Sequence, residues 1–129
     1  VSLDTSEYSV ISDTIISGNT STRDLFTVTS TKFRLEKVQV LNNQSTAECA
    51  GIHLYDSHLE LLEGTFTSVM TADQSPSISG GFLRMGSEST ANVSKTTFSN
   101  GVAFQGGAIY AEESSSLKCD DCTFRDSVV

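Results

Sequence analysis

The amino-acid sequence predicts an all-β fold, a single-stranded parallel β-helix of about five coils, each about 25–26 residues long with three short strands. Three observations support this prediction. Apolar residues return at a nearly constant spacing along the whole chain. Within each repeat the apolar residues alternate with polar residues, which is typical of a strand with one buried face. Gly, Ser, Asn and Asp separate the apolar stretches, as expected of turns.

The repeat becomes visible when one apolar anchor per coil is aligned. The anchors are 25, 26, 32 and 26 residues apart, and further apolar residues lie seven and five positions before most of them. The expected coil boundaries are about 1–23, 24–49, 50–80, 81–106 and 107–129. This alignment predicts three columns of inward-facing side chains: Val1, Phe26, Ile52, Leu83, Ile109; Tyr8, Phe33, Leu59, Ala91, Leu117; and Ile15, Val40, Phe66, Phe98, Phe124. In the last column the rings from Phe66 to Phe124 are expected to stack.

One coil alone buries too few side chains to offset the entropy of ordering its backbone, so the coils must stack. Apolar residues stand at inward positions from Val1 onward, and no capping element is visible in the sequence. Exposed strand edges invite association. We therefore expect the chain to be an internal segment of a longer β-helix.

The extra length of the third coil falls in residues 69–80, at the corner where spacing varies most. Insertions collect where a loop leaves the scaffold, and such loops often carry binding residues. Met70, Asp73, Gln74, Pro76 and Ile78 are therefore the candidate recognition residues of this loop. A neutral surface insertion is the alternative.

Composition and charge exclude some partners. Lys and Arg total 8 against 16 for Asp and Glu, a net charge of −8, and such a chain lacks the clustered cations that nucleic-acid binding requires. No apolar run approaches the roughly 20 residues of a membrane-spanning helix. We expect neither nucleic acid as a partner nor a membrane-spanning segment.

The cysteines and histidines do not predict a redox-active or metal-binding site. Cys119 and Cys122 have the spacing of a redox pair, but no helix N-terminus is predicted beside them, so two buried thiols or a local disulfide are the remaining interpretations. Cys49 lies at another corner. His53 is expected to face solvent on its strand, and His58 follows at the next corner, so no metal site is predicted.

Asp120 and Asp121 could act as the paired carboxylates of a polysaccharide hydrolase, although two Asp residues at a corner are more simply turn residues. No catalytic residue, cofactor or enzymatic activity is predicted.

Three Asn residues begin N-x-Ser/Thr sequons and are therefore candidate glycosylation sites: Asn19, Asn43 and Asn92.

Outward residues should form columns too. Arg34 is expected beside Glu60 one coil away, as an exposed ion pair. The outward column of the first strands reads Ser2, Thr27, His53, Arg84 and Tyr110, and the column just before the anchors reads Thr14, Gln39, Thr65, Thr97 and Thr123. Thr is a favourable outward strand residue, which explains the second column.

Gly106-Gly107-Ala108-Ile109, followed by Cys122-Thr123-Phe124-Arg125-Asp126, resembles the repeats of the chlamydial polymorphic membrane proteins, built on G-G-A-I and F-x-x-N motifs. Related repeats occur in large surface proteins of some protists. Gly80-Gly81-Phe82-Leu83 is a looser version of the first motif, and Asn43 stands at the F-x-x-N spacing from Val40. The resemblance implies a right-handed, pectin-lyase-like parallel β-helix, extracellular display and adhesion, and it transfers no catalytic residues.

Together these observations favour a non-enzymatic segment of a cell-surface or secreted protein, acting in adhesion or recognition or as a structural stalk. The expected partners are neighbouring coils of a longer chain, other subunits of a surface assembly, or glycans. A carbohydrate-active β-helix, either a lyase or hydrolase, or a carbohydrate-binding module is the alternative.

Overall fold

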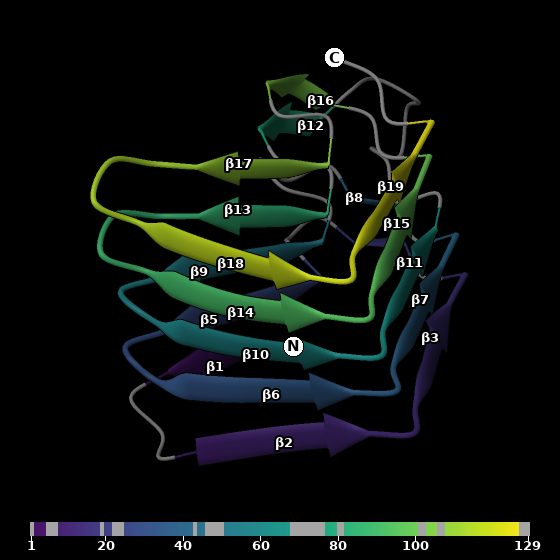
Figure 1. Ribbon diagram of the computed structural model, residues 1–129, viewed down its shortest axis with the longest axis horizontal. Helices are drawn as coiled ribbons and strands as arrows, with labels where there is room; N and C mark the ends of the chain where they lie inside the picture. The colour runs from purple at the N-terminus through teal and green to yellow at the C-terminus, as the bar shows by residue number, and fades with distance from the viewer. Residues whose placement is uncertain are drawn as a thin grey trace.

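The computed structural model describes residues 2–4, 8–18, 20–21, 25–42, 44–45, 51–67, 77–79, 82–100, 103–105 and 108–126. Every regular element in these residues is a β-strand, and all pairings between strands are parallel. The strands stack coil upon coil into a parallel β-solenoid (Figure 1). The all-β parallel fold predicted from the alternating apolar residues is therefore confirmed. The described residues form no helix that could cross a membrane.

Three five-stranded sheets make the walls of the solenoid. The first sheet contains β1 (Ser2–Asp4), β5 (Phe26–Thr29), β9 (Ile52–Tyr55), β13 (Leu83–Met85) and β17 (Ile109–Ala111). The second contains β2 (Tyr8–Ser12), β6 (Lys32–Glu36), β10 (His58–Leu62), β14 (Thr90–Ser94) and β18 (Ser116–Asp120). The third contains β3 (Ile15–Ser17), β7 (Gln39–Leu41), β11 (Thr65–Thr67), β15 (Thr97–Ser99) and β19 (Thr123–Arg125).

Consecutive strands of the chain belong to different sheets, so each strand pairs with its counterpart one circuit away. In Figure 1 the second sheet lies in front of the first, and the third stands at the right. Two short pairs were not expected: β4 (Thr20–Ser21) with β8 (Gln44–Ser45), and β12 (Ser77–Ser79) with β16 (Ala103–Gln105). They extend regular pairing into the corner where the spacing of the chain varies most.

The predicted inward columns are confirmed beyond the first coil. Phe26, Ile52, Leu83 and Ile109 are axial partners, as are Phe33, Leu59, Ala91 and Leu117, and Val40, Phe66, Phe98 and Phe124. Val1 lies outside the described residues. The expected stack of rings is present, with centroids 5.4 Å apart for Phe66 and Phe98 and 5.1 Å apart for Phe98 and Phe124.

The predicted register of β2 and β3 is wrong by one residue. Ser9, not Tyr8, is opposite Phe33, and Ile16, not Ile15, is opposite Val40. Tyr8 and Ile15 are consequently 50% and 63% exposed, respectively.

The corner between β2 and β3 explains the shift. Asp13 has a positive φ of 48° and is equivalent to Lys37, Glu63, Lys95 and Asp121, which have the same left-handed conformation in the other coils. The predicted register would place Ser12 there, and Asp adopts this conformation more readily. Thr14 then lies at the corner, where its hydroxyl donates to the Ser12 carbonyl at 2.7 Å, so Ile15 takes its place in the expected threonine column.

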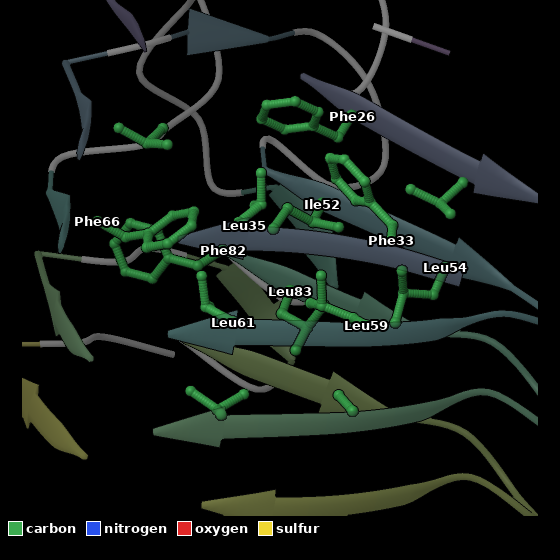
Figure 2. Close-up of a cluster of buried hydrophobic side chains, with 14 of the residues drawn as sticks. Phe26, Phe33, Leu35, Ile52, Leu54, Leu59, Leu61, Phe66, Phe82 and Leu83 are labelled. Atoms are coloured by element: carbon green, nitrogen blue, oxygen red, sulfur yellow. The ribbon is translucent and has the colours of Figure 1, made fainter. Parts of the chain in front are cut away.

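The core lies between the three sheets and is apolar (Figure 2). Phe82, just before β13, belongs to none of the predicted columns and is fully buried. Its ring centroid lies 6.2 Å from that of Phe66 and 5.7 Å from that of Phe98, so it fills the space beside the stacked rings.

Candidate functional site

The recognition loop predicted from the insertion lies mostly outside the described residues. Met70, Asp73, Gln74 and Pro76 fall there, whereas Ile78 is the central residue of β12, which pairs with β16. The backbone at Ile78 thus continues the solenoid. The role of this loop stays a prediction.

Of the candidate glycosylation sites, Asn19 and Asn43 lie outside the described residues. Asn92 is exposed at the centre of β14, between Glu60 and Lys118 on the outward face of the second sheet. Its side-chain amide is therefore accessible, although it lies on a strand and not in a loop.

Cys119 and Cys122 are free thiols. Cys122 packs against the core and its Sγ lies 3.5 Å from the Val93 carbonyl oxygen, whereas Cys119 is exposed, contrary to the expectation that both thiols are buried. Partial burial and the neighbouring Cys122 thiol raise the pKa of Cys119 to about 11, which favours the unreactive protonated form. Cys49 lies outside the described residues.

Asp121 occupies the left-handed corner, with φ 56°, and the Asp120 carbonyl accepts the Lys95 backbone N–H at 3.0 Å. Equivalent corners carry Lys37 or Glu63, so the position requires a conformation and not a particular charge. This favours the turn interpretation of the two Asp residues.

The predicted ion pair on the second sheet is confirmed. Arg34 Nη1 lies 3.5 Å from Glu60 Oε2, and Arg34 Nη2 lies 3.4 Å from Glu36 Oε2. The Tyr8 hydroxyl donates to the same Glu60 oxygen at 3.2 Å. This contact exists because Tyr8 points outward, as the corrected register requires.

His53 was expected to face solvent, and this expectation is wrong because only 2% of the residue is exposed. The residue does stand at an outward position of β9, aligned with Thr27 and Arg84. The side chain of Tyr55, two residues along the same face, covers it. The two rings stack with centroids 4.0 Å apart, and the Tyr55 hydroxyl lies 3.0 Å from His53 Nδ1.

The outward column of the first sheet continues from His53 through Arg84 to Tyr110. Arg84 Nη2 donates to Glu112 Oε1 at 2.9 Å, and the guanidinium carbon lies 5.9 Å from the centroid of the Tyr110 ring. The hydrogen bond from Arg84 holds the pKa of the Glu112 carboxyl below its ordinary value. Arg84 is thus positioned by a carboxylate and an aromatic ring from the next coil.

A hollow of about 380 Å³ opens beside this column. Tyr55 directly follows Leu54, Gly86 follows Met85, and Glu112 follows Ala111, so Tyr55, Gly86 and Glu112 occupy equivalent positions of successive coils. Gly86 has no side chain to fill the space, and a Cβ there would lie 2.8 Å from the Leu54 carbonyl oxygen. We call this space the Tyr55 hollow; it is lined by His53, Tyr55, Asp56, Arg84, Gly86, Ser87 and Glu112.

A second hollow of about 490 Å³ lies around the corner between the first and second sheets. We call it the corner hollow; it is lined by Tyr8, Ser30, Thr31, Lys32, Asp56, Ser57, His58, Glu88 and Thr90. Asp56 lines both hollows. The two therefore adjoin at that residue.

Beneath this corner lies a column of buried hydroxyl residues that the sequence reasoning missed. The hydroxyl of Ser57 donates to the carbonyl oxygens of Tyr55 and Val28, which lie 2.7 and 3.1 Å from its Oγ, and the Oγ accepts the backbone N–H of Thr31 at 3.3 Å. The backbone N–H of Ser57 in turn donates to Ser89 Oγ at 3.4 Å. The sequence does carry a signal for this column, because Thr31, Ser57 and Ser89 each stand directly before the second strand of their coil.

Comparisons with protein-family models, curated proteins and solved structures gave no match to this chain. Within the described part of the chain, no group of three or more His, Cys, Asp or Glu side chains could hold a metal ion. The interpretation of the two hollows therefore rests on their geometry and charge.

Proposed function

We propose that this chain is a non-enzymatic segment of a cell-surface or secreted protein, and that it acts in adhesion or recognition. The observation that carries the proposal is the junction of the Tyr55 hollow and the corner hollow at Asp56 on one edge of a stacked scaffold. Strands hydrogen-bonded at about 4.8 Å hold side chains from successive coils at fixed positions. Residues far apart in the sequence, such as Tyr55 and Glu112, thereby form one preorganised surface.

The surface beyond β17, β18 and β19 supports a role as a stalk. In the described residues these strands pair on one side only. Leu117 and Phe124 continue the inward columns there and are 37% and 47% exposed. An exposed strand edge with an apolar surface favours further pairing. We propose that coils of the same kind cover it, from a longer chain or from another subunit.

The solenoid is proposed to be right-handed and pectin-lyase-like, with the repeat of the polymorphic membrane proteins. In support, Ala108 of the G-G-A-I motif is buried, and Ile109, the last residue of that motif, is the axial partner of Leu83, the last residue of the looser copy. Phe124, the Phe of the second motif, lies in the third inward column opposite Phe98. Extracellular display is the corresponding localisation, and an accessible Asn92 is compatible with it.

The experiment has two parts. Antibodies against the chain should label intact, unpermeabilised source cells, and excess soluble chain should compete with the adhesion of those cells to their substratum. A Tyr55→Ala chain should compete less well, whereas Ile15→Ala, which trims an exposed apolar side chain on the third sheet, should compete like the wild type. Labelling only after permeabilisation, or equal competition by both variants, would contradict the proposal.

A further inference from the structure

We propose that the Tyr55 hollow and the adjoining corner hollow together bind a neutral oligosaccharide. One pyranose ring lies against the exposed part of the Tyr55 ring, and the carboxylates of Glu112 and Asp56 accept hydrogen bonds from its hydroxyls. This inference rests on the proposed recognition function and names the class of ligand.

Tyr55 provides the apolar platform. It is 43% exposed although one side of its ring is stacked on His53, so the ring is held in place and still faces the hollow. A fixed aromatic ring offers a large contact area at low entropic cost. The C–H face of a pyranose is the part of a sugar that such a ring complements.

The polar groups around Tyr55 match hydroxyls. The Glu112 carboxylate accepts from Arg84 at 2.9 Å and from the backbone N–H of Ser87, and an ionised carboxylate has about four acceptor sites, so it retains acceptor capacity. Asp56 supplies a second, exposed carboxylate at the junction of the hollows. Two carboxylates beside an aromatic ring can accept hydrogen bonds from neighbouring hydroxyls while the apolar side of the sugar is covered.

The charge of the surface disfavours the acidic class of sugars. The hollows are lined by the cations Lys32 and Arg84 and by the anions Asp56, Glu88 and Glu112, which leaves a small negative balance. Arg84, the cation next to Tyr55, is already neutralised by Glu112. The whole chain carries a net charge of −8. A uronic, sialic or sulfated sugar is therefore disfavoured, whereas a neutral sugar needs no cation at the surface.

The size of the surface favours more than one sugar ring. The hollows measure about 380 and 490 Å³, each toward the lower part of the roughly 300–1,000 Å³ range of small-molecule sites. They meet at Asp56 and turn a corner that is supported by the buried hydroxyls of Ser57 and Ser89. A chain of sugars can thus pass from the first sheet to the second.

The test is saturation-transfer NMR on the folded chain with neutral methyl glycosides and their di- and trisaccharides. A single ring in so open a site should bind with a Kd on the order of 1 mM, and the longer sugars should bind more tightly. Tyr55→Ala should weaken binding about tenfold, whereas Tyr55→Phe, which keeps the ring, should stay close to the wild type. Glu112→Gln should also weaken binding, whereas Glu63→Gln, at an exposed corner between the second and third sheets, should not. Circular dichroism establishes that each variant is folded.

The outcomes separate the ligand class from the recognition function. If no neutral sugar binds, if Tyr55→Ala binds like the wild type, or if glucuronate or a lysine-rich peptide binds more tightly, the saccharide inference is wrong. Adhesion that still depends on Tyr55 would then leave the recognition function standing with another ligand. Sugar binding that depends on Tyr55, in a chain that does not compete with adhesion, would instead contradict the proposed function alone.

Discussion

Gly51→Ala should destabilise the solenoid strongly, because it brings two coils into collision at their backbones. A Cβ at Gly51 would lie 2.2 Å from the Phe82 carbonyl oxygen, 2.8 Å from its carbonyl carbon and 2.9 Å from its Cα. Relief requires the coils to move apart by about 1 Å, since ordinary contacts begin near 3.5 Å. That movement stretches the hydrogen bond that joins the two coils beside Gly51, from Ile52 N to Phe82 O, now 2.7 Å.

The magnitude follows from these two effects. Overpacking in a rigid core costs about 1–3 kcal/mol, and the weakened hydrogen bond costs about 0.5–1.5 kcal/mol. The smaller conformational freedom of Ala in the unfolded chain offsets about 0.4–1 kcal/mol. The free energy of unfolding should therefore fall by about 1–4 kcal/mol.

Gly64→Ala is the matched control. Gly64 is also buried, but its Cβ would meet the ends of side chains, Leu61 Cδ1 at 3.0 Å and Phe66 Cε2 at 3.2 Å. These groups can rotate slightly, so we expect a change within about 1 kcal/mol. Urea unfolding followed by far-ultraviolet circular dichroism measures both variants. Equal losses for Gly51→Ala and Gly64→Ala would refute the account of the backbone collision.

Three further predictions concern the stacked Phe rings, the stability of the fold at acidic pH and the reactivity of the thiols. Phe98→Ala should lower the free energy of unfolding by about 3–5 kcal/mol in urea titrations, and Phe124→Ala by clearly less, because Phe124 is 47% exposed; equal effects would contradict the buried stack. The lowered pKa of Glu112 contributes stability that is present above the ordinary carboxyl value of 4.5 and is lost as the pH falls through the folded-state pKa, so Glu112→Gln should lose less stability on acidification in thermal melts than the wild type. Cys119, with its pKa raised to about 11, should react slowly with maleimide near neutral pH, and Cys122→Ser should speed its reaction by removing one cause of the shift; an unchanged rate would show that the neighbouring thiol has no influence.

The fold was predictable because the inward columns are large and unambiguous over most of the chain. Phe33, Leu59 and Phe66 each alternate with polar residues, so only one face of each strand can be buried. The first coil lacks this clarity. Ile15 and Ile16 are both apolar, and alternation alone therefore allows either to face the core.

The conformation of the corner decides the register there. A left-handed residue is needed at a fixed distance before each anchor, and Asp13 supplies it. A sequence analysis that aligned the corners as well as the apolar residues would have compared Asp13 with Asp121 and placed Ile16 inward. Apolar periodicity shows which face of a strand is buried, whereas the residue types at the turn show how many residues separate one strand from the next.

The candidate site could be predicted only in part. The outward column of His53, Arg84 and Tyr110 follows from the register and is confirmed. The burial of His53 does not follow from it, because the position on a strand says which way a side chain leaves the sheet and not what covers it afterwards. The covering ring belongs to Tyr55, and the partner of Arg84 is Glu112, one coil further along.

Gly86 shows why the Tyr55 hollow cannot be predicted from the sequence of any single strand. It is the residue after β13, and its lack of a side chain leaves the hollow open because Tyr55 and Glu112 flank it from the coils on either side. Any larger residue would also press on the Leu54 carbonyl, so coil packing and an open surface both require glycine at this position. In a solenoid a surface hollow is therefore specified across coils, by residues about 26–31 positions apart, such as Tyr55, Gly86 and Glu112.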